Sequence, residues 1–132
     1  MIRQKRTSLS NLPEFADVSR SERARFESLS TVLAIPAGGV LMTEGAFGNE
    51  AMLVLEGDLV IERDGDAIAM VGPGTVVGEQ ALLLNEPRNA TVTAASDVLV
   101  AAMSRREFTS ILEVCPTVGR RILNAALERV AA

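Results

Sequence analysis

The chain has 132 residues, 48% of them hydrophobic, and a formal net charge of −4; this length suits one domain with a hydrophobic core. Residues 44–86 hold nine acids and Arg63 as their single base, and a surface of this kind repels nucleic acid. No window is long and apolar enough to span a bilayer, and no apolar signal region follows the basic start of the chain. We therefore expect neither nucleic acid nor a membrane among its partners.

Histidine is absent, which excludes Ser-His and Cys-His catalysis and removes the usual ligand of zinc, copper and non-haem iron. We expect no catalytic residue, no metal ion and no cofactor. The lone Cys115 cannot form an internal disulfide, which favours a reduced, cytoplasmic protein. Because no histidine is present to activate it, Cys115 is interpreted as a small buried residue at a helix end.

The first predicted element follows a basic segment. Residues 1–11 are interpreted as a flexible tail, and residues 12–132 as one domain, since no internal repeat or low-complexity linker divides them. Ser19 and Glu22 have the spacing of a capping box, which predicts a short helix that ends near Leu29.

Short runs with the composition of β-strands fill the middle of the chain, separated by glycines. The runs are residues 31–35, 40–42, 51–55, 59–62, 68–71, 91–94 and 98–101. Asp64-Gly65 lies between two of them and is a strong signal for a two-residue hairpin. Turns at such short, regular spacing predict a β-sandwich or a β-barrel.

Two helices are predicted after the strands. Ser104 and Glu107 form a second capping box, and Pro116 marks the start of the next helix. From residue 117 onward the apolar positions form one stripe, made of Val118, Ile122, Leu123, Ala126, Leu127 and Val130. We expect this stripe to pack against the strands, with pairing to a second copy as the alternative.

Residues 78–92, GEQALLLNEPRNATV, carry charged chemistry at a fixed spacing. Arg88 supplies a planar guanidinium that can grip two phosphate oxygens at once. Residues 80–84 are predicted to form one helical turn whose first amides, with Ala81 and Leu82 among them, point at a phosphate. Glu79 is an ionised acceptor, which suits a ribose hydroxyl.

The neighbours of these groups complete a candidate site. Gly78 lets the chain turn sharply before Glu79, and Asn89 could donate its amide to a phosphate or a base. One cation, one anion and free amides match a cyclic nucleotide, which has a singly charged phosphodiester and a free 2′-hydroxyl. A triphosphate fits less well, because it needs several cations or a Gly-rich loop with a lysine.

The same run resembles the phosphate-binding cassette of cyclic nucleotide-binding domains, Gly-Glu-x-Ala-Leu followed by Pro-Arg-small-Ala-Thr-Val. The resemblance, to the effector domain of the catabolite activator protein type, covers residues 12–130 and includes motifs at 12–19, 35–38, 43–45, 54–57 and 71–74. It implies a mainly β fold, an eight-stranded β-roll (a jelly-roll barrel) flanked by an N-terminal helical segment and two C-terminal helices. It also implies a lid formed by the last helix and a base pocket formed by Ile68, Val71, Val77, Asn124 and Arg129.

The chain departs from the family pattern at three places, the third being that it ends within the expected lid helix. Val77 stands where relatives usually have Phe, and Asn89 stands where Ser, Thr or Ala is common. Ser or Thr there often accompanies cGMP preference, so Asn89 leaves the base open, and we favour cAMP over cGMP. DNA-reading relatives continue with a helix-turn-helix, and nothing follows Ala132. We expect either a stand-alone receptor module without a DNA-binding domain or a fragment of a longer protein.

Three functions are compatible with these features. The favoured one is a non-catalytic regulatory module that binds a cyclic nucleotide and signals to a protein partner. In the second, a degenerate domain binds no ligand and serves as a structural scaffold or homodimer through its C-terminal helix. The third, an enzyme, is disfavoured, because the best acid cluster lies on a hairpin and is expected in water: Asp58, Glu62, Asp64 and Asp66.

Overall fold

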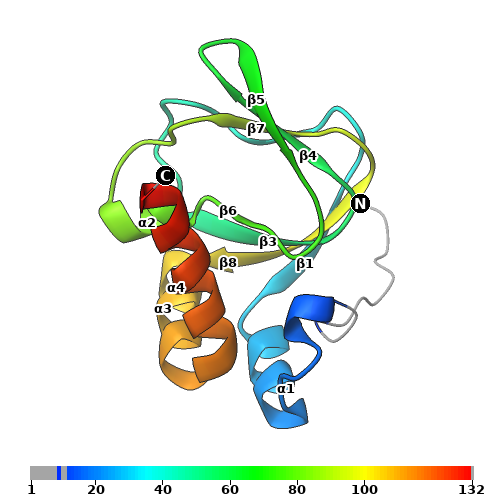
Figure 1. Ribbon diagram of the computed structural model, residues 1–132, viewed down its shortest axis with the longest axis vertical. Coiled ribbons are helices and arrows are strands. Elements are labelled where there is room, and N and C mark those ends of the chain that lie inside the picture. The colour runs from blue at the N-terminus through cyan, green and yellow to red at the C-terminus, as the bar shows by residue number, and fades with distance from the viewer. Residues whose placement is uncertain (1–8, 10–11, 132) are drawn as a thin grey trace.

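The strands form two antiparallel sheets (Figure 1). The computed structural model describes residue 9 and residues 12–131, without the side chains of Glu14 and of residues 126–131. The first sheet has the order β1 (Thr31–Ile35), β8 (Val98–Ser104), β3 (Glu50–Glu56), β6 (Val76–Val77). The second has the order β2 (Val40–Met42), β7 (Thr91–Ala94), β4 (Leu59–Arg63), β5 (Asp66–Val71).

Over the described part of the chain there are eight strands, which confirms the expected strand number and the jelly-roll fold. The expectation of a barrel was wrong in one respect, because the two sheets do not join into a closed barrel. The turn at residues 72–74 carries the chain from β5 in the second sheet to β6 in the first. Strand β6 has only two residues and pairs only with β3 among the described strands, so it ends the first sheet.

The core has two parts, one on each face of the first sheet. In β3, alternate side chains point to opposite faces, so Leu53 packs with the helices while Val54 packs between the sheets. Both faces are covered, and all five residues from Ala51 to Leu55 are buried. This arrangement explains why the β3 sequence is a continuous apolar run rather than an alternating one.

The helices cover the outer face of the first sheet. They are the 3-10 turn η2 (Pro13–Phe15), α1 (Arg20–Ser28), α3 (Arg105–Val114) and α4 (Pro116–Ala131). The buried side chains at this face include Phe26, Ile111, Val118 and Ile122. Of the predicted stripe, Val118 and Ile122 are buried in the domain's own core and Leu123 is partly exposed. The side chains of its last three members lie outside the described residues.

The two predicted capping boxes have different outcomes. At α3 both bonds form, since Ser104 Oγ accepts from Glu107 N at 3.1 Å and the Glu107 carboxylate accepts from Ser104 N at 2.8 Å. At α1 only the first is present: Ser19 Oγ accepts from Glu22 N at 3.2 Å. The Glu22 carboxylate instead accepts from Val118 N in the first turn of α4, at 2.8 Å. The prediction of a full box at Ser19 was therefore wrong, because a tertiary partner takes the carboxylate.

The remaining local predictions concern the turn between β4 and β5, the end of α3 and the start of the chain. Asp64 and Gly65 have φ values of 54° and 83°, as a two-residue turn between β4 and β5 requires. Cys115 is buried at the end of α3, as expected. Of the predicted tail, residues 1–8, 10 and 11 lie outside the described residues, and Leu9 is buried in the core. None of the described helices is long and apolar enough to cross a membrane.

Candidate functional site

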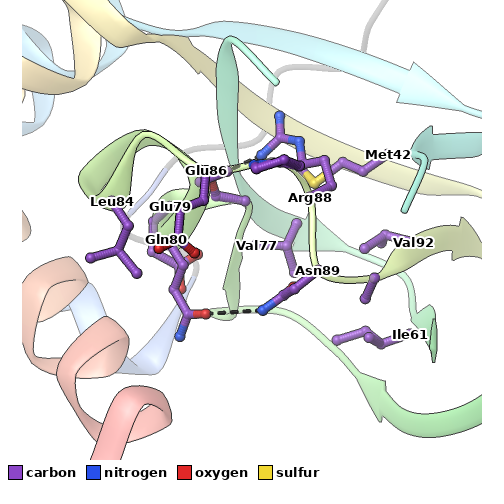
Figure 2. Close-up of a pocket in the computed structure, with 14 residues that line it drawn as sticks. Met42, Ile61, Val77, Glu79, Gln80, Leu84, Glu86, Arg88, Asn89 and Val92 are labelled. Atoms are coloured by element: carbon purple, nitrogen blue, oxygen red, sulfur yellow. Dashed lines mark hydrogen bonds between the residues drawn. The ribbon is translucent and has the colours of Figure 1, made fainter. Parts of the chain in front are cut away.

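A pocket opens between the segment 77–90 and the inner face of the second sheet (Figure 2). Its floor is apolar, with Met42 from β2, Ile61 from β4 and Val92 from β7. Its other side is formed by α2 (Glu79–Leu84) and the turn that follows it. Six residues predicted from the sequence line it: Val77, Gly78, Glu79, Ala81, Arg88 and Asn89.

Glu79 is the first residue of α2, and its side chain is completely buried, with an exposed fraction of 0%. The chain reaches it through Gly78, which has a φ of 84° that residues with side chains rarely adopt. A Cβ at position 78 would lie 2.6 Å from Arg88 Nη1 and 2.9 Å from the Glu50 carbonyl oxygen. Glycine is therefore required here both by backbone conformation and by the packing of the arginine.

Arg88 is also buried, with an exposed fraction of 9%. Its Nη1 donates to the Gly78 carbonyl at 2.9 Å, and its Nη2 donates to the Glu50 carbonyl at 2.6 Å. Gly48 leaves room for this arrangement, since a Cβ there would lie 1.9 Å from Arg88 Cζ. The two bonds use two of the five guanidinium N–H donors, so others remain to reach an anion.

The backbone of Arg88 is held as firmly as its side chain. Arg88 N donates to the Ala46 carbonyl, and Gly45 N donates to the Arg88 carbonyl, each at 2.8 Å. Burial lowers the pKa of the Arg88 guanidinium from its ordinary value, while the carboxylates of Glu50 and Glu79 oppose that shift. Arginine remains charged after any such shift, so the pocket has a fixed positive charge on its wall.

Asn89 and Gln80 face each other across the pocket. Asn89 Nδ2 donates to Gln80 Oε1 at 3.2 Å, as the dashed line in Figure 2 shows. The backbone carbonyl of Asn89 also accepts from Arg63 Nε at 3.0 Å. The side chain of Asn89 therefore joins α2 to the segment after Arg88.

The other predicted residues lie away from this pocket. Leu82 is on α2, but its side chain is buried in the helical core and does not line the pocket. Ile68 is exposed on β5, and Val71 packs against the core between the sheets. Asn124 lines a separate hollow between α4 and the turn at Gly74, and the Arg129 side chain lies outside the described residues. The structure thus brings Val77, but not Ile68, Val71 or Asn124, to the cassette.

Sequence reasoning missed most of the apolar lining. Ile61 and Val92 are opposite each other in the β4–β7 register, so both point to the same face. That pairing is the signal that could have found them, but it becomes visible only when the strand partners are known. Gln80 was missed because it occupies the unspecified position of the Gly-Glu-x-Ala-Leu pattern.

Residues 20–115 match the family model described as the cyclic nucleotide-binding domain. The chain is 31% identical over 113 residues to a cyclic nucleotide-gated potassium channel of Mesorhizobium japonicum, covering 86% of this chain and 29% of the channel. It is 31% identical over 106 residues to a cAMP-dependent protein kinase regulatory subunit of Yarrowia lipolytica, covering 79% of this chain and 28% of the subunit.

Comparison with solved structures shows a shared fold. The catabolite activator protein of Thermus thermophilus matches with a TM-score of 0.78 and 24% identity, over 90% of this chain and 58% of that one. The chain spans less than a third of the length of the potassium channel and of the kinase regulatory subunit named above. With a family model matched over most of its length, this chain belongs to the cyclic nucleotide-binding domain family.

Proposed function

We propose that this chain is a non-catalytic regulatory module that binds a cyclic nucleotide, with cAMP as its ligand. The observation that carries the proposal is the pair Glu79 and Arg88, both buried and both on the wall of one pocket. Burying charged groups is unfavourable unless they are paired or hydrogen-bonded. A scaffold that binds nothing would gain little from keeping such a pair beside an open pocket.

Each part of the ligand has a counterpart in the pocket. The cyclic phosphate would bind the remaining Arg88 donors and the first amides of α2, those of Ala81 and Leu82 among them, as charge-assisted hydrogen bonds. The ribose 2′-hydroxyl would donate to the Glu79 carboxylate beside Gly78. The base would lie on the apolar lining, where Val77 and Ile61 offer a surface that a purine can cover.

The choice of cAMP depends on the residues near the base. Asn89 offers a carboxamide that is already bonded to Gln80, where other family members offer a hydroxyl or a methyl group. The relative from Yarrowia lipolytica is named as cAMP-dependent. Tighter binding of cGMP than of cAMP would overturn the choice of base and leave the phosphate and ribose contacts in place.

The regulatory output would be mechanical. A nucleotide that bonds to Arg88 and Glu79 together would draw residues 78–91 inward, and α3 and α4 would repack in response. Such coupling requires the ligand to bind the two arrangements with different affinities. Repacking of α3 and α4 would then change the surface that a protein partner meets.

A thermal-shift screen with cAMP, cGMP and 5′-AMP tests the proposal. A ligand that binds only the folded state raises the melting temperature, and one hundred times its Kd in free ligand adds about 2.7 kcal/mol. We expect a rise with cAMP, a smaller rise with cGMP and none with 5′-AMP, whose phosphate is not cyclic. No shift with either cyclic nucleotide, at concentrations up to the millimolar range, would contradict the proposal.

A further inference from the structure

One hydrogen bond links the candidate site to the helix that follows the strands. Arg105, the first residue of α3, donates from Nη1 to the carbonyl of Leu82 in α2, at 2.6 Å. A helix leaves the carbonyls of its last turn without intrahelical partners, and Leu82 lies in that turn. Arg105 therefore caps the C-terminal end of α2 from a different helix, with a positive charge at the negative end of the helix dipole.

The backbone of Arg105 reaches the second half of the site. Arg105 N donates to the Asn49 carbonyl at 3.0 Å. The next residue, Glu50, is the one whose carbonyl holds Arg88 Nη2. The start of α3 is thus bonded both to the helix that carries Glu79 and to the strand end that orients Arg88.

The short length of α2 makes this contact important. The helix has six residues, and isolated helices shorter than about 12–15 residues are marginal in water. Its position therefore depends on tertiary contacts, namely the buried Leu82 side chain on one side and the Arg105 bond at its end. A shift of α2 would move the Glu79 carboxylate and the first amides of the helix together.

We propose that Arg105 is a positioning residue, which fixes α2 in the geometry that binds ribose and phosphate. The inference rests on the proposed function, since it assumes that α2 contacts a nucleotide. Arg105 itself is not one of the described residues that line the pocket. Its contribution to binding is therefore indirect.

The chain offers a matched control in the adjacent arginine. Arg106 has the same charge and is exposed like Arg105, but among the described side chains no hydrogen bond joins it to α2. Arg105→Gln and Arg106→Gln change the net charge equally. Arg105→Lys keeps the charge and one donor, so it should restore part of the effect.

Hydrogen exchange without nucleotide tests the positioning role directly. In Arg105→Gln we expect amides in the peptide 79–86 to exchange about tenfold faster than in the wild type, the size expected when a charge-assisted bond is lost. Exchange in the strands should not change, and Arg106→Gln should match the wild type throughout. Equal exchange of residues 79–86 in all three proteins, or equal acceleration in both variants, would overturn the inference.

Calorimetric titration with cAMP completes the test. We expect Arg105→Gln to weaken binding about tenfold, Arg105→Lys to recover part of that loss, and Arg106→Gln to stay within about twofold of the wild type. If Arg105→Gln binds as tightly as the wild type, the positioning role is wrong. If the wild type binds neither cAMP nor cGMP, the proposed function fails, and the exchange experiment still decides whether Arg105 holds α2.

Discussion

Among the described side chains, those of two glutamates are buried, yet their surroundings differ. Glu22 is 5% exposed and its carboxylate accepts from Val118 N, in a buried junction between α1 and α4. Glu79 is 0% exposed and lines a pocket beside Arg88. The first carboxylate satisfies an amide that the start of α4 would otherwise leave without a partner. The second lies on the wall of a pocket, so burial alone does not identify a binding residue.

The largest expected effect on stability comes from the first of these acids. Glu22→Ala removes a charge-assisted bond at the start of α4 and leaves the Val118 amide buried, so we expect unfolding to become easier by about 3 kcal/mol. Chemical denaturation measures this loss. Affinity for cAMP, measured where the variant is folded, should stay within about threefold of the wild type. A large affinity loss with normal stability would remove the distinction between the two acids.

The space around Arg88 provides the next test. Gly48→Ala places a Cβ on the guanidinium, which must then leave its place on the pocket wall, so we expect cAMP binding to fall by about 2 kcal/mol. The matched control is Gly72→Ala, whose Cβ would lie 3.0 Å from Asp58 Oδ1 and 4.0 Å from the Gly57 carbonyl oxygen. In titrations with cAMP we expect Gly48→Ala to bind more weakly than Gly72→Ala. Equal affinities of the two variants would show that the position of Arg88 does not affect binding.

The role of Glu79 is tested best from the ligand side. Glu79→Gln should weaken cAMP binding about tenfold, because a hydrogen bond to a charged acceptor becomes one to a neutral acceptor. Binding of 2′-deoxy-cAMP, which lacks the hydroxyl donor, should be nearly the same in the variant and the wild type. Equal losses for both ligands would mean that Glu79 supports the pocket without contacting the sugar.

The smallest effect is expected at an exposed ion pair far from the pocket. Arg121 donates to both carboxylate oxygens of Asp17 at 2.7 Å, and this bond lowers the pKa of Asp17 below its ordinary value. A carboxyl whose pKa is lowered on folding contributes stability above its unfolded pKa, and that contribution is lost as pH falls through the folded value. Asp17→Asn should therefore lower the melting temperature slightly at neutral pH.

Acid and salt should both reduce this small difference. The difference between Asp17→Asn and the wild type should shrink as pH falls below the ordinary range of an aspartate, and it should shrink in high salt because exposed pairs are screened. Melting curves at several pH values check both points. A difference that grows on acidification would contradict the assignment.

The two glutamates also show which features of the structure could be predicted from the sequence and which could not. Strand positions and helix starts were predictable because turn residues and capping spacings act locally: β1, β2 and β7 have the predicted bounds. The partner of Glu22 was not predictable, since Val118 is 96 residues away in the chain. Strand β6 was missed because two residues between Gly74 and Gly78 are too few to show a period.

The candidate site likewise has a part that could be predicted from the sequence and a part that could not. Gly78, Glu79 and Arg88 could be predicted because they lie in one continuous motif, and the structure places all three around one pocket. The apolar lining comes from β2, β4 and β7, so it depends on strand pairing that the sequence does not show. Ile68 illustrates the difficulty: it lies in a predicted strand, but its side chain points to solvent on β5.

The central claim is that Arg88 holds the cyclic phosphate, and calorimetric titration of cAMP into the wild type, Arg88→Ala and the control Arg106→Ala tests it most directly. We predict that Arg88→Ala weakens binding by about 2–3 kcal/mol, because a charge-assisted pair is lost, while Arg106→Ala binds like the wild type. Unchanged affinity in a folded Arg88→Ala protein would contradict the account.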